Sequence, residues 1–514
     1  MYAVALCFGV APLWAAHALP LVDLPQHLHL ISVLHRIDDA TTLYPEYFAR
    51  RPQLTPYLGY YYSVSALNWL FPLELANRIF LSLYVAGLPL SLAFLLASLK
   101  RPVWPSLLSL PFAYGDSFAW GFVNYCSALP LAFVTCGLFI RAIEDPPRRR
   151  AWAVGAAAAL VCVLLFHVQV FGWLAFALPL LLITTRAPSD AEGLVARLKA
   201  RQAALLSVIP GVALFFAWVG LRFGQPEEIV PGQPWKSWGP MLSAENLSYK
   251  TFDQNKADFV PVLSGMLRDQ SDSFAVTAAF VVAGVAIVAA LVTGRDTREG
   301  HLERWRIVGL AGLALVLYFT LPFDIRGYMY YLNTRYAHLA AALLVCAVPA
   351  LKPKFTRVGL LLAGAVALAT ALPLWKAFGQ FDAEAAALTE LSKHASERPK
   401  VMGLIFNTGS ATMTHPVWLH ASTVIARERG GITNFTFALT PHSPVMYREG
   451  KTPPSFASEW RPDTMDWATQ GAAYDHFVIR GIPPERVFGP QLSSGLLQVT
   501  AKAQDFWLVT RTPR

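Results

Sequence analysis

The stretch AWAVGAAAALVCVLLFHVQVFGWLAFALPLLLIT, residues 151–184, contains no Asp, Glu, Lys or Arg. One helical crossing of a bilayer takes about 20 apolar residues, so the stretch is too long for one crossing and tight for two. Its polarity rises only at His167–Gln169, near the middle. We therefore predict two membrane-spanning helices joined by a short turn at these residues.

Similar apolar runs recur up to about residue 376. Hydrophobic residues make up 55% of the chain and charged residues 15%, whereas soluble domains carry roughly 25% charged residues. This composition argues against a purely soluble enzyme, and the aromatic content of 13% excludes a disordered chain. A polar turn at Gly115–Ser117 divides the run 102–140 into two. About eleven spans are predicted, over residues 2–20, 79–98, 103–114, 118–140, 152–166, 169–184, 204–221, 274–293, 307–322, 336–350 and 358–376.

Basic residues concentrate in the short loops that this arrangement places on one side of the membrane. The positive-inside rule assigns such loops to the cytoplasm. The chain is then a multi-pass protein of the plasma (inner) membrane with a cytoplasmic N-terminus and an extracytoplasmic C-terminal domain. Topology and contact with anionic membrane lipids explain the net charge of +9, so we expect no nucleic-acid partner. The basic loops are 100–101, 141–150, 186–201, 295–306 and 352–357.

Two apolar segments need separate interpretation. Residues 57–72 (YLGYYYSVSALNWLFP) lie in the first outer loop (21–78), and a crossing here would move Lys100 and Arg101 to the outer side. Their Tyr and Trp residues favour the interface, so we predict a helix lying on the outer face. Residues 1–20 are predicted to form the first span. A cleaved signal peptide is the alternative, although the run lacks a basic start.

The pattern changes after residue 377. No long apolar run follows, and residues 378–514 have the size of an ordinary soluble domain. Helical periodicity is found at 383–396 and 415–429, and strand patterns at 401–406, 473–481 and 496–511. The predicted fold is therefore mainly α: a polytopic helix bundle (1–377) followed by a C-terminal extracytoplasmic α/β domain (378–514). No phosphate-binding loop, dinucleotide fingerprint or nucleophile elbow is present in that domain.

Two aspartates are predicted to lie at the outer membrane face. Asp23 begins the sequence DLPQHLH directly after the first span, and Pro25 suggests that a helix starts there with Asp23 near its N-cap. Asp116 lies in the second outer turn. The pair could hold a divalent cation, Mg²⁺ or Mn²⁺, or act as general base and assisting group. A helix cap and a turn aspartate are the simpler alternatives. His27 follows Asp23, but His27 and His29 point in different directions on a helix.

Further polar residues are predicted at the same face. His167 lies in the third outer turn, and the fifth outer loop contains Arg326, Tyr331 and Arg335. A fixed guanidinium suits a phosphate group, although an interfacial arginine among aromatic residues would look the same. The fourth outer loop (223–272) is long enough to close over a site. Its tryptophans could stack on sugar rings, although Trp at a membrane interface is also expected without a ligand. The polar and aromatic residues of this loop are Glu227, Glu228, Trp235, Lys236, Trp238, Lys250 and Lys256.

The membrane half, residues 1–376, resembles the GT-C class of membrane glycosyltransferases, which includes protein O-mannosyltransferases, aminoarabinose transferases and oligosaccharyltransferases. The resembling features are an acidic residue after the first span (Asp23), a second one in the next outer loop (Asp116), an interfacial helix (57–72) and an Arg-bearing entry to the next span (Asn77–Arg78). The adjacent acidic pair of the mannosyltransferases is absent, because Leu24 follows Asp23. The sequence is most similar to poorly characterised bacterial members.

This resemblance implies a glycosyltransferase that moves a sugar from a polyprenyl-phosphate-linked donor to an unknown acceptor at the outer face. Asp23 and Asp116 would then be catalytic or metal-binding, while His27, His167, Arg326, Tyr331 and Arg335 would bind the substrate. Two other functions stay open. One is a transporter or flippase of a lipid-linked or anionic substrate, which the absence of internal repeats disfavours. The other is a non-enzymatic membrane assembly protein.

Overall fold

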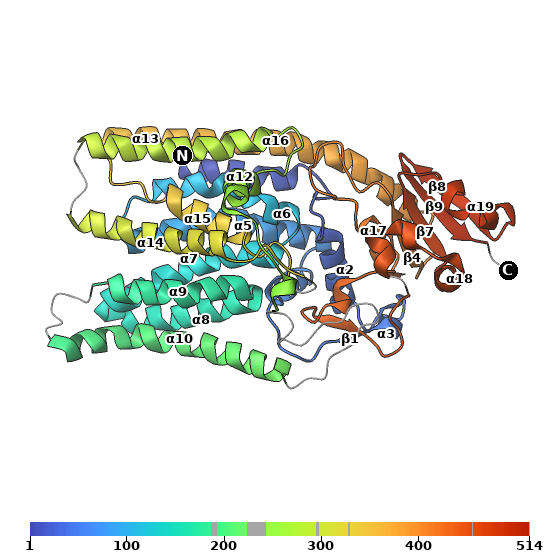
Figure 1. Cartoon of the computed structure of the whole chain (residues 1–514), viewed down its shortest axis with the longest axis horizontal. Coiled ribbons are helices and arrows are strands. Elements are labelled where there is room, and N and C mark those ends of the chain that lie inside the picture. Colours follow the sequence, from blue (N-terminus) through green and yellow to red (C-terminus); the bar gives the residue numbers. More distant parts are fainter. Residues whose placement is uncertain (187–192, 224–242, 294–297, 327–328, 455, 513–514) are drawn as a thin grey trace.

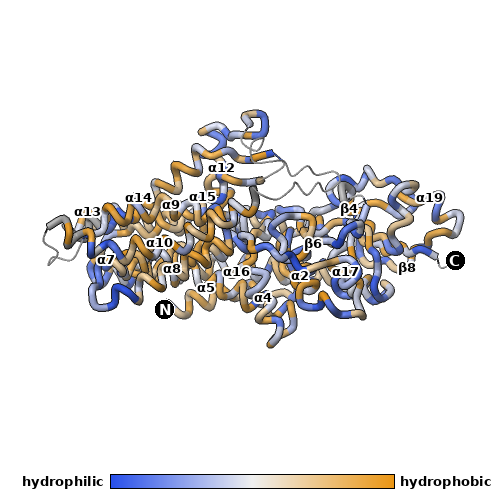
Figure 2. The backbone as a smooth tube through the Cα atoms, turned by 90° about the horizontal axis from the view of Figure 1, so that it is seen from below, coloured by the Kyte–Doolittle hydropathy of each residue, from blue (hydrophilic) through white to orange (hydrophobic). Residues whose placement is uncertain are grey.

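The protein consists of a helix bundle and a small sheet domain, placed end to end (Figure 1). The computed structural model describes residues 1–186, 193–223, 243–293, 298–326, 329–454 and 456–512. Hydrophobic residues dominate the bundle helices, whereas polar and apolar residues alternate in the sheet domain (Figure 2). The mainly α class, with a C-terminal sheet domain, is thus confirmed.

A helical element is found at each of the predicted apolar runs. Among the described residues, six helices are long and apolar enough to cross a membrane. Two others, η2 and α15, have 11 residues each, which is shorter than a single crossing, and they lie buried inside the bundle. The elements are α1 (Tyr2–Val10) with η1 (Ala11–Trp14), α5 (Leu73–Ser98), η2 (Trp104–Tyr114), α7 (Val123–Glu144), α8 (Arg149–Phe166), α9 (Val168–Thr184), α10 (Gly193–Phe223), α13 (Ser271–Thr293), α14 (Arg298–Thr320), α15 (Arg335–Val345) and α16 (Pro353–Ser392).

Both predicted polar turns break the helices where expected. At His167 the backbone is extended, so α8 ends at Phe166 and α9 begins at Val168. Gly115 is also extended and separates η2 from α6 (Asp116–Ala119). A Cβ on Gly115 would lie 2.4 Å from Nε2 of His338, so this close approach requires glycine. The two turns therefore belong to the end of the bundle that faces the sheet domain.

The described parts of the basic loops lie together at the opposite end of the bundle (Figure 1). Lys100 pairs with Glu144 at 3.8 Å, and the buried Arg306 lies 3.4 Å from the same carboxylate and donates to the backbone oxygen of Thr184 at 2.6 Å. These contacts join the loops after α5, α7 and α9 to the start of α14. The predicted alternation of loops between the two membrane faces therefore agrees with the packing.

The sheet domain is built on five strands in the order β5-β4-β7-β9-β8. The first three are parallel, and β9 and β8 are antiparallel to their neighbours. The predicted strands at 401–406, 473–481 and 496–511 are confirmed, whereas the helix expected at 415–429 begins later, at Ala421. The elements are β4 (Lys400–Ile405), α17 (Ala421–Glu428), β5 (Ile432–Thr433), η5 (Phe437–Leu439), η6 (Phe456–Glu459), η7 (Pro462–Thr464), α18 (Trp467–Gln470), η8 (Gly471–Ala473), β7 (His476–Arg480), α19 (Glu485–Ser493), β8 (Leu497–Ala503) and β9 (Phe506–Arg511).

Helix α16 connects the two parts without a break. It runs from Pro353 to Ser392 and so continues through residue 378, where the sequence predicts the start of the second domain. Its first part packs on α13 and η2, and its last part packs on α17, β8 and β9. The apolar core is likewise continuous from the bundle into the sheet domain.

The first loop folds back onto the sheet domain. Strand β1 (Phe48–Arg50) pairs antiparallel with β6 (Val445–Tyr447), and α2 packs against α17. This loop contains α4, which lies within the predicted interfacial segment 57–72. Its other elements, and those of the later loops, are α2 (Leu24–His35), α3 (Tyr44–Tyr47), α4 (Gly59–Leu67), η3 (Pro146–Arg148), η4 (Ala244–Asn246), β2 (Leu247–Ser248), α12 (Phe252–Leu263) and β3 (Asp324–Ile325).

A carboxylate on α16 fixes the chain that leads into α2. Oδ1 of Asp382 accepts from the backbone N–H groups of His17 at 2.8 Å and Ala18 at 2.9 Å. We expect Asp382→Ala to lower the free energy of unfolding by about 1–2 kcal/mol, because two backbone donors lose their partner. Thermal unfolding in detergent measures this. The control is Glu390→Ala, which removes a surface ion pair from the same helix and should leave the midpoint unchanged.

Candidate functional site

A cleft lies where the bundle meets the sheet domain, and we call it the interdomain cleft. Its cavity volume is about 180 Å³. Its wall combines side chains from the first loop, from the ends of three bundle helices and from the sheet domain. Four of the predicted site residues line it: Asp23, His27, His167 and Arg335. The complete lining is Asp23, His27, Tyr57, Tyr61, Phe122, Val123, Asn124, Tyr125, His167, Arg335, Phe437, Thr440 and His442.

Asp23 occupies the N-cap position of α2, as predicted. Its backbone N–H donates to the oxygen of Trp120 at 3.1 Å, in a turn where Gly121 has a φ of +85°. A Cβ on Gly121 would lie 3.0 Å from the backbone nitrogen of Asp23, so the turn can approach this closely only with glycine. The side chain of Asp23 makes no capping hydrogen bond to α2. Its carboxylate is therefore available to other groups.

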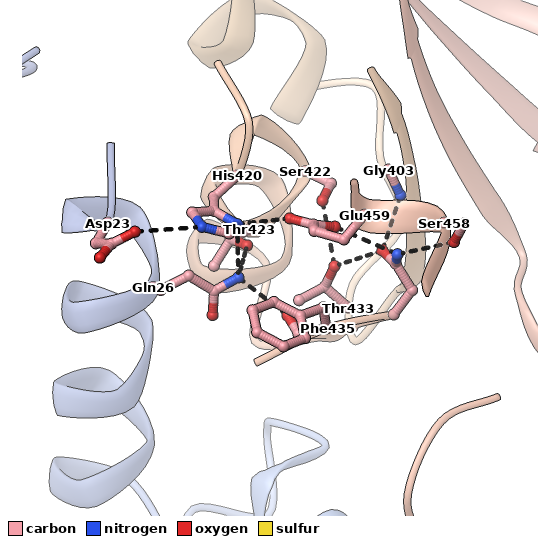
Figure 3. Close-up of polar contacts among 11 residues, drawn as sticks. Asp23, Gln26, Gly403, His420, Ser422, Thr423, Thr433, Phe435, Ser458 and Glu459 are labelled. Atoms are coloured by element: carbon pink, nitrogen blue, oxygen red, sulfur yellow. Dashed lines mark hydrogen bonds and ion pairs between the residues drawn. The ribbon is translucent and has the colours of Figure 1, made fainter. Parts of the chain in front are cut away.

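One oxygen of that carboxylate faces a histidine of the sheet domain (Figure 3). Nε2 of His420 lies 3.5 Å from Oδ1 of Asp23, and Nδ1 of His420 lies 2.6 Å from Oε1 of Glu459. Burial by itself lowers the pKa of His420, but the hydrogen bonds and charges of the two carboxylates outweigh it and raise the pKa to about 9. His420 is therefore a cation at neutral pH, placed between two carboxylates.

His27 lies on the other side of Asp23. Its Nδ1 is 2.7 Å from the hydroxyl of Tyr61, and its Nε2 is 3.1 Å from the backbone oxygen of Gly121. Burial lowers the pKa of His27 to about 4, so the ring is neutral, with the proton on Nε2 where the carbonyl accepts it. His29 packs instead on Tyr44 in the core, so the two histidines do point apart, as predicted.

Arg335 is held rigidly at the start of α15. Its Nη1 donates to Oε1 of Gln169 at 2.6 Å and lies 3.2 Å from Nε2 of His167. The guanidinium also lies over the ring of Phe122, 4.4 Å from its centre. Within the described part of the chain, its Nε has no hydrogen-bond partner. The cleft is thus lined by a cation that its neighbours hold in place.

Three predicted site residues lie outside the cleft lining. Asp116 pairs with Nε2 of His415 at 2.7 Å, beside Trp120. Tyr331 packs on Trp120, and burial together with the charges of nearby aspartates raises the pKa of Tyr331 to about 12. Arg326 is exposed near strand β3. Residues 224–242 of the fourth outer loop, including Glu227, Glu228, Trp235, Lys236 and Trp238, lie outside the described residues.

The divalent cation stays a prediction. Among the described residues, no group of three or more His, Cys, Asp or Glu side chains is arranged to hold a metal ion. Asp23 and Asp116 each face a different histidine, His420 and His415 respectively. We derive no step through a metal.

Sequence reasoning did not identify His415, His420 and Glu459. These residues lie in the C-terminal domain, and no local motif marks them. His415 and His420 lie about 300 and 400 positions from their partners Asp116 and Asp23, and Glu459 pairs with His420. Their role follows only from the docking of the sheet domain on the bundle.

The fold is that of the GT-C membrane glycosyltransferases, and the chain is a multi-pass membrane protein. It is similar over its full length to solved structures of ArnT from Cupriavidus metallidurans. The form bound to undecaprenyl phosphate is 12% identical with a TM-score of 0.52, and the apo form is 12% identical with a TM-score of 0.51; 98% of each is covered.

A third similar structure is the arabinofuranosyltransferase AftD from Mycobacteria, at 11% identity and a TM-score of 0.50. The whole chain superposes on 40% of AftD. No protein-family model and no curated protein sequence matches the chain. At these identities the similarity establishes the fold, and a fold alone does not determine which reaction takes place in the cleft.

The charge of His420 makes stability depend on pH. Its pKa is about 9 in the folded protein and about 6.5 when unfolded, so its contribution is complete below pH 6.5 and is lost as pH rises through 9. We expect a loss of about 3 kcal/mol across this window. Thermal unfolding from pH 6 to 10 should show wild type approaching His420→Gln as pH rises. Parallel curves would contradict the assignment.

Proposed function

We propose that the protein is a glycosyltransferase that moves a sugar from a polyprenyl-phosphate-linked donor to an acceptor hydroxyl in the interdomain cleft. The observation that carries this proposal is the placement of a carboxylate and a fixed guanidinium in one cleft at the end of a membrane bundle. Asp23 and Arg335 both line it, and Arg335 begins a bundle helix. The GT-C fold and the undecaprenyl phosphate held by ArnT support the same donor class.

The carboxylate of Asp23 suits the acceptor in such a reaction, and the guanidinium of Arg335 suits the donor phosphate. The acceptor oxygen would form a bond to the anomeric carbon while the bond from that carbon to the donor phosphate breaks. The proton of the acceptor hydroxyl would pass to the carboxylate of Asp23. Polyprenyl phosphate would leave with the bonding electrons, and its negative charge would face Arg335. Because Gln169, His167 and Phe122 already hold the guanidinium, it needs no reorganisation when that charge develops.

The orientation of the protein in the membrane is part of the same proposal. The basic loops at the far end of the bundle support a cytoplasmic location for that end. The cleft and the sheet domain would then lie on the outer face of the plasma membrane, with the N-terminus in the cytoplasm. The acceptor would come from that side, while the donor would arrive from the membrane. Asp116 and Tyr331, two of the three predicted site residues outside the cleft lining, would shape the surface next to the cleft.

Removal of the guanidinium should weaken binding of the lipid phosphate. We expect Arg335→Ala to reduce the affinity for undecaprenyl phosphate about 10- to 100-fold, since a charge-assisted contact is lost, and Arg335→Lys to retain part of it. Thermal shift of detergent-purified protein with added lipid measures this. The control is Arg461→Ala, an exposed arginine of the sheet domain. Equal stabilisation of all variants by the lipid would reject the donor site.

Removal of the carboxylate should stop transfer but not binding. We expect Asp23→Asn to lower kcat at least about 100-fold in an assay with polyprenyl-phosphate sugars, because the acceptor proton has no base. Stabilisation by undecaprenyl phosphate should persist in this variant. Full transfer activity in Asp23→Asn would refute the assigned role. Lipid movement across a vesicle membrane without any sugar transfer would instead indicate a transporter.

A further inference from the structure

The side chain of His420 joins the two parts of the molecule. It occupies the N-cap position of α17 in the sheet domain and is 2% exposed. One ring nitrogen faces Asp23 of the first loop at 3.5 Å, and the other faces Glu459 of the sheet domain at 2.6 Å. An imidazole protonated on both nitrogens can hydrogen-bond to Glu459 and form an ion pair with Asp23 at the same time. His420 therefore forms a charged bridge across the boundary.

The far end of this bridge is anchored in the sheet. Oε2 of Glu459 accepts from Nδ2 of Asn434 at 3.3 Å. Oδ1 of Asn434 accepts from the backbone N–H of Gly403 at 3.0 Å and from the hydroxyl of Thr433 at 3.1 Å. A Cβ on Gly403 would lie 2.6 Å from Oγ of Ser422, so glycine lets β4 approach α17 this closely. The position of Glu459 is thus set by β4 and β5 (Figure 3).

The ring of His420 is also held on its faces. It stacks on Phe435 at 5.8 Å and 20°, and it meets Phe437 edge-on at 5.8 Å and 80°. From the other side, Nε2 of Gln26 donates to the hydroxyl of Thr423 at 2.9 Å and to the backbone oxygen of Phe435 at 3.0 Å. Gln26 lies one turn after Asp23 on α2. The contacts on both sides therefore fix the separation of His420 and Asp23.

We propose that His420 is the positioning residue for Asp23: it holds one carboxylate oxygen so that the carboxylate presents its other oxygen to the interdomain cleft. This inference rests on the proposed function, since it concerns the base of that reaction. His420 does not line the cleft, whereas Asp23 does and is 18% exposed. His420 therefore acts through Asp23 and not on the substrate.

Domain docking alone does not account for the bridge. Replacement of a whole buried ion network by apolar side chains is often neutral for stability, because desolvation of the charges offsets their attraction. Docking is already provided by the pairing of β1 with β6, by Gln26 and by the continuous apolar core. The bridge differs from a docking contact in one respect: it ends at Asp23, a partly exposed carboxylate that is fixed in orientation beside the interdomain cleft.

The first test measures transfer by the full-length protein in nanodiscs, with a panel of polyprenyl-phosphate sugars. We expect His420→Gln to lower kcat about 10- to 100-fold and to leave the KM for the donor within about twofold, because Arg335 is untouched. Glu459→Gln should cause a smaller loss of the same kind. An unchanged kcat in His420→Gln would overturn the proposal.

The matched control is His476→Gln. His476 is another buried histidine of the sheet domain, and its Nδ1 pairs with Oδ1 of Asp475 at 2.9 Å. It lies in β7 and has no contact with Asp23. We expect its kcat to equal that of wild type. An equal loss in His476→Gln and His420→Gln would mean that any buried histidine of the domain has this effect, and the positioning role would be refuted.

A second test needs no activity. In a thermal-unfolding cycle, His420→Gln should lower the midpoint by at least about 2 °C more in wild type than in Asp23→Asn, where the contact is already lost. His476→Gln should lower it equally in both backgrounds. Additive effects of His420→Gln would overturn the inference even if the wild type transfers sugar. A coupled cycle with no transfer by wild type would refute the proposed function while leaving the bridge in place.

Discussion

Charged groups are costly inside a membrane bundle, and the structure depends on where they are placed. The described bundle helices carry their charges at their two ends. At one end, Glu144 forms ion pairs with Lys100 and Arg306 and so connects the loop after α5 to α14. At the other end, Asp23 and Arg335 line the interdomain cleft. One end of the bundle therefore carries the basic loops, and the other end carries the cleft.

The sheet domain completes the cleft at this end of the bundle. The bundle residues Gln169, His167 and Phe122 already hold Arg335, whereas the carboxylate of Asp23 makes no capping hydrogen bond to its own helix. Docking of the sheet adds His420 behind Asp23 and closes the cleft with Phe437, Thr440 and His442. The unbroken helix α16 and the β1–β6 pairing make this docking part of the fold, so the two domains form one site.

Local sequence features were sufficient to predict much of the fold. Apolar runs, polar turns at Gly115 and His167, and the strand patterns after residue 400 each report on their own segment. Asp23, His27, His167 and Arg335 were found because a polar residue at the end of an apolar run is conspicuous. The short buried elements η2 and α15 could not be distinguished from full crossings, since both are surrounded by protein and therefore as apolar as a lipid-facing helix.

The residues that sequence reasoning missed share one physical property. His420 and Glu459 acquire their character only from tertiary contacts, because an imidazole between two carboxylates differs in charge from the same imidazole in an extended chain. The sheet domain has no motif of its own for the same reason: its contribution is to set the orientation of a carboxylate that another domain supplies. Because the site is divided between two domains, it depends more on how the domains dock than on any single local sequence motif.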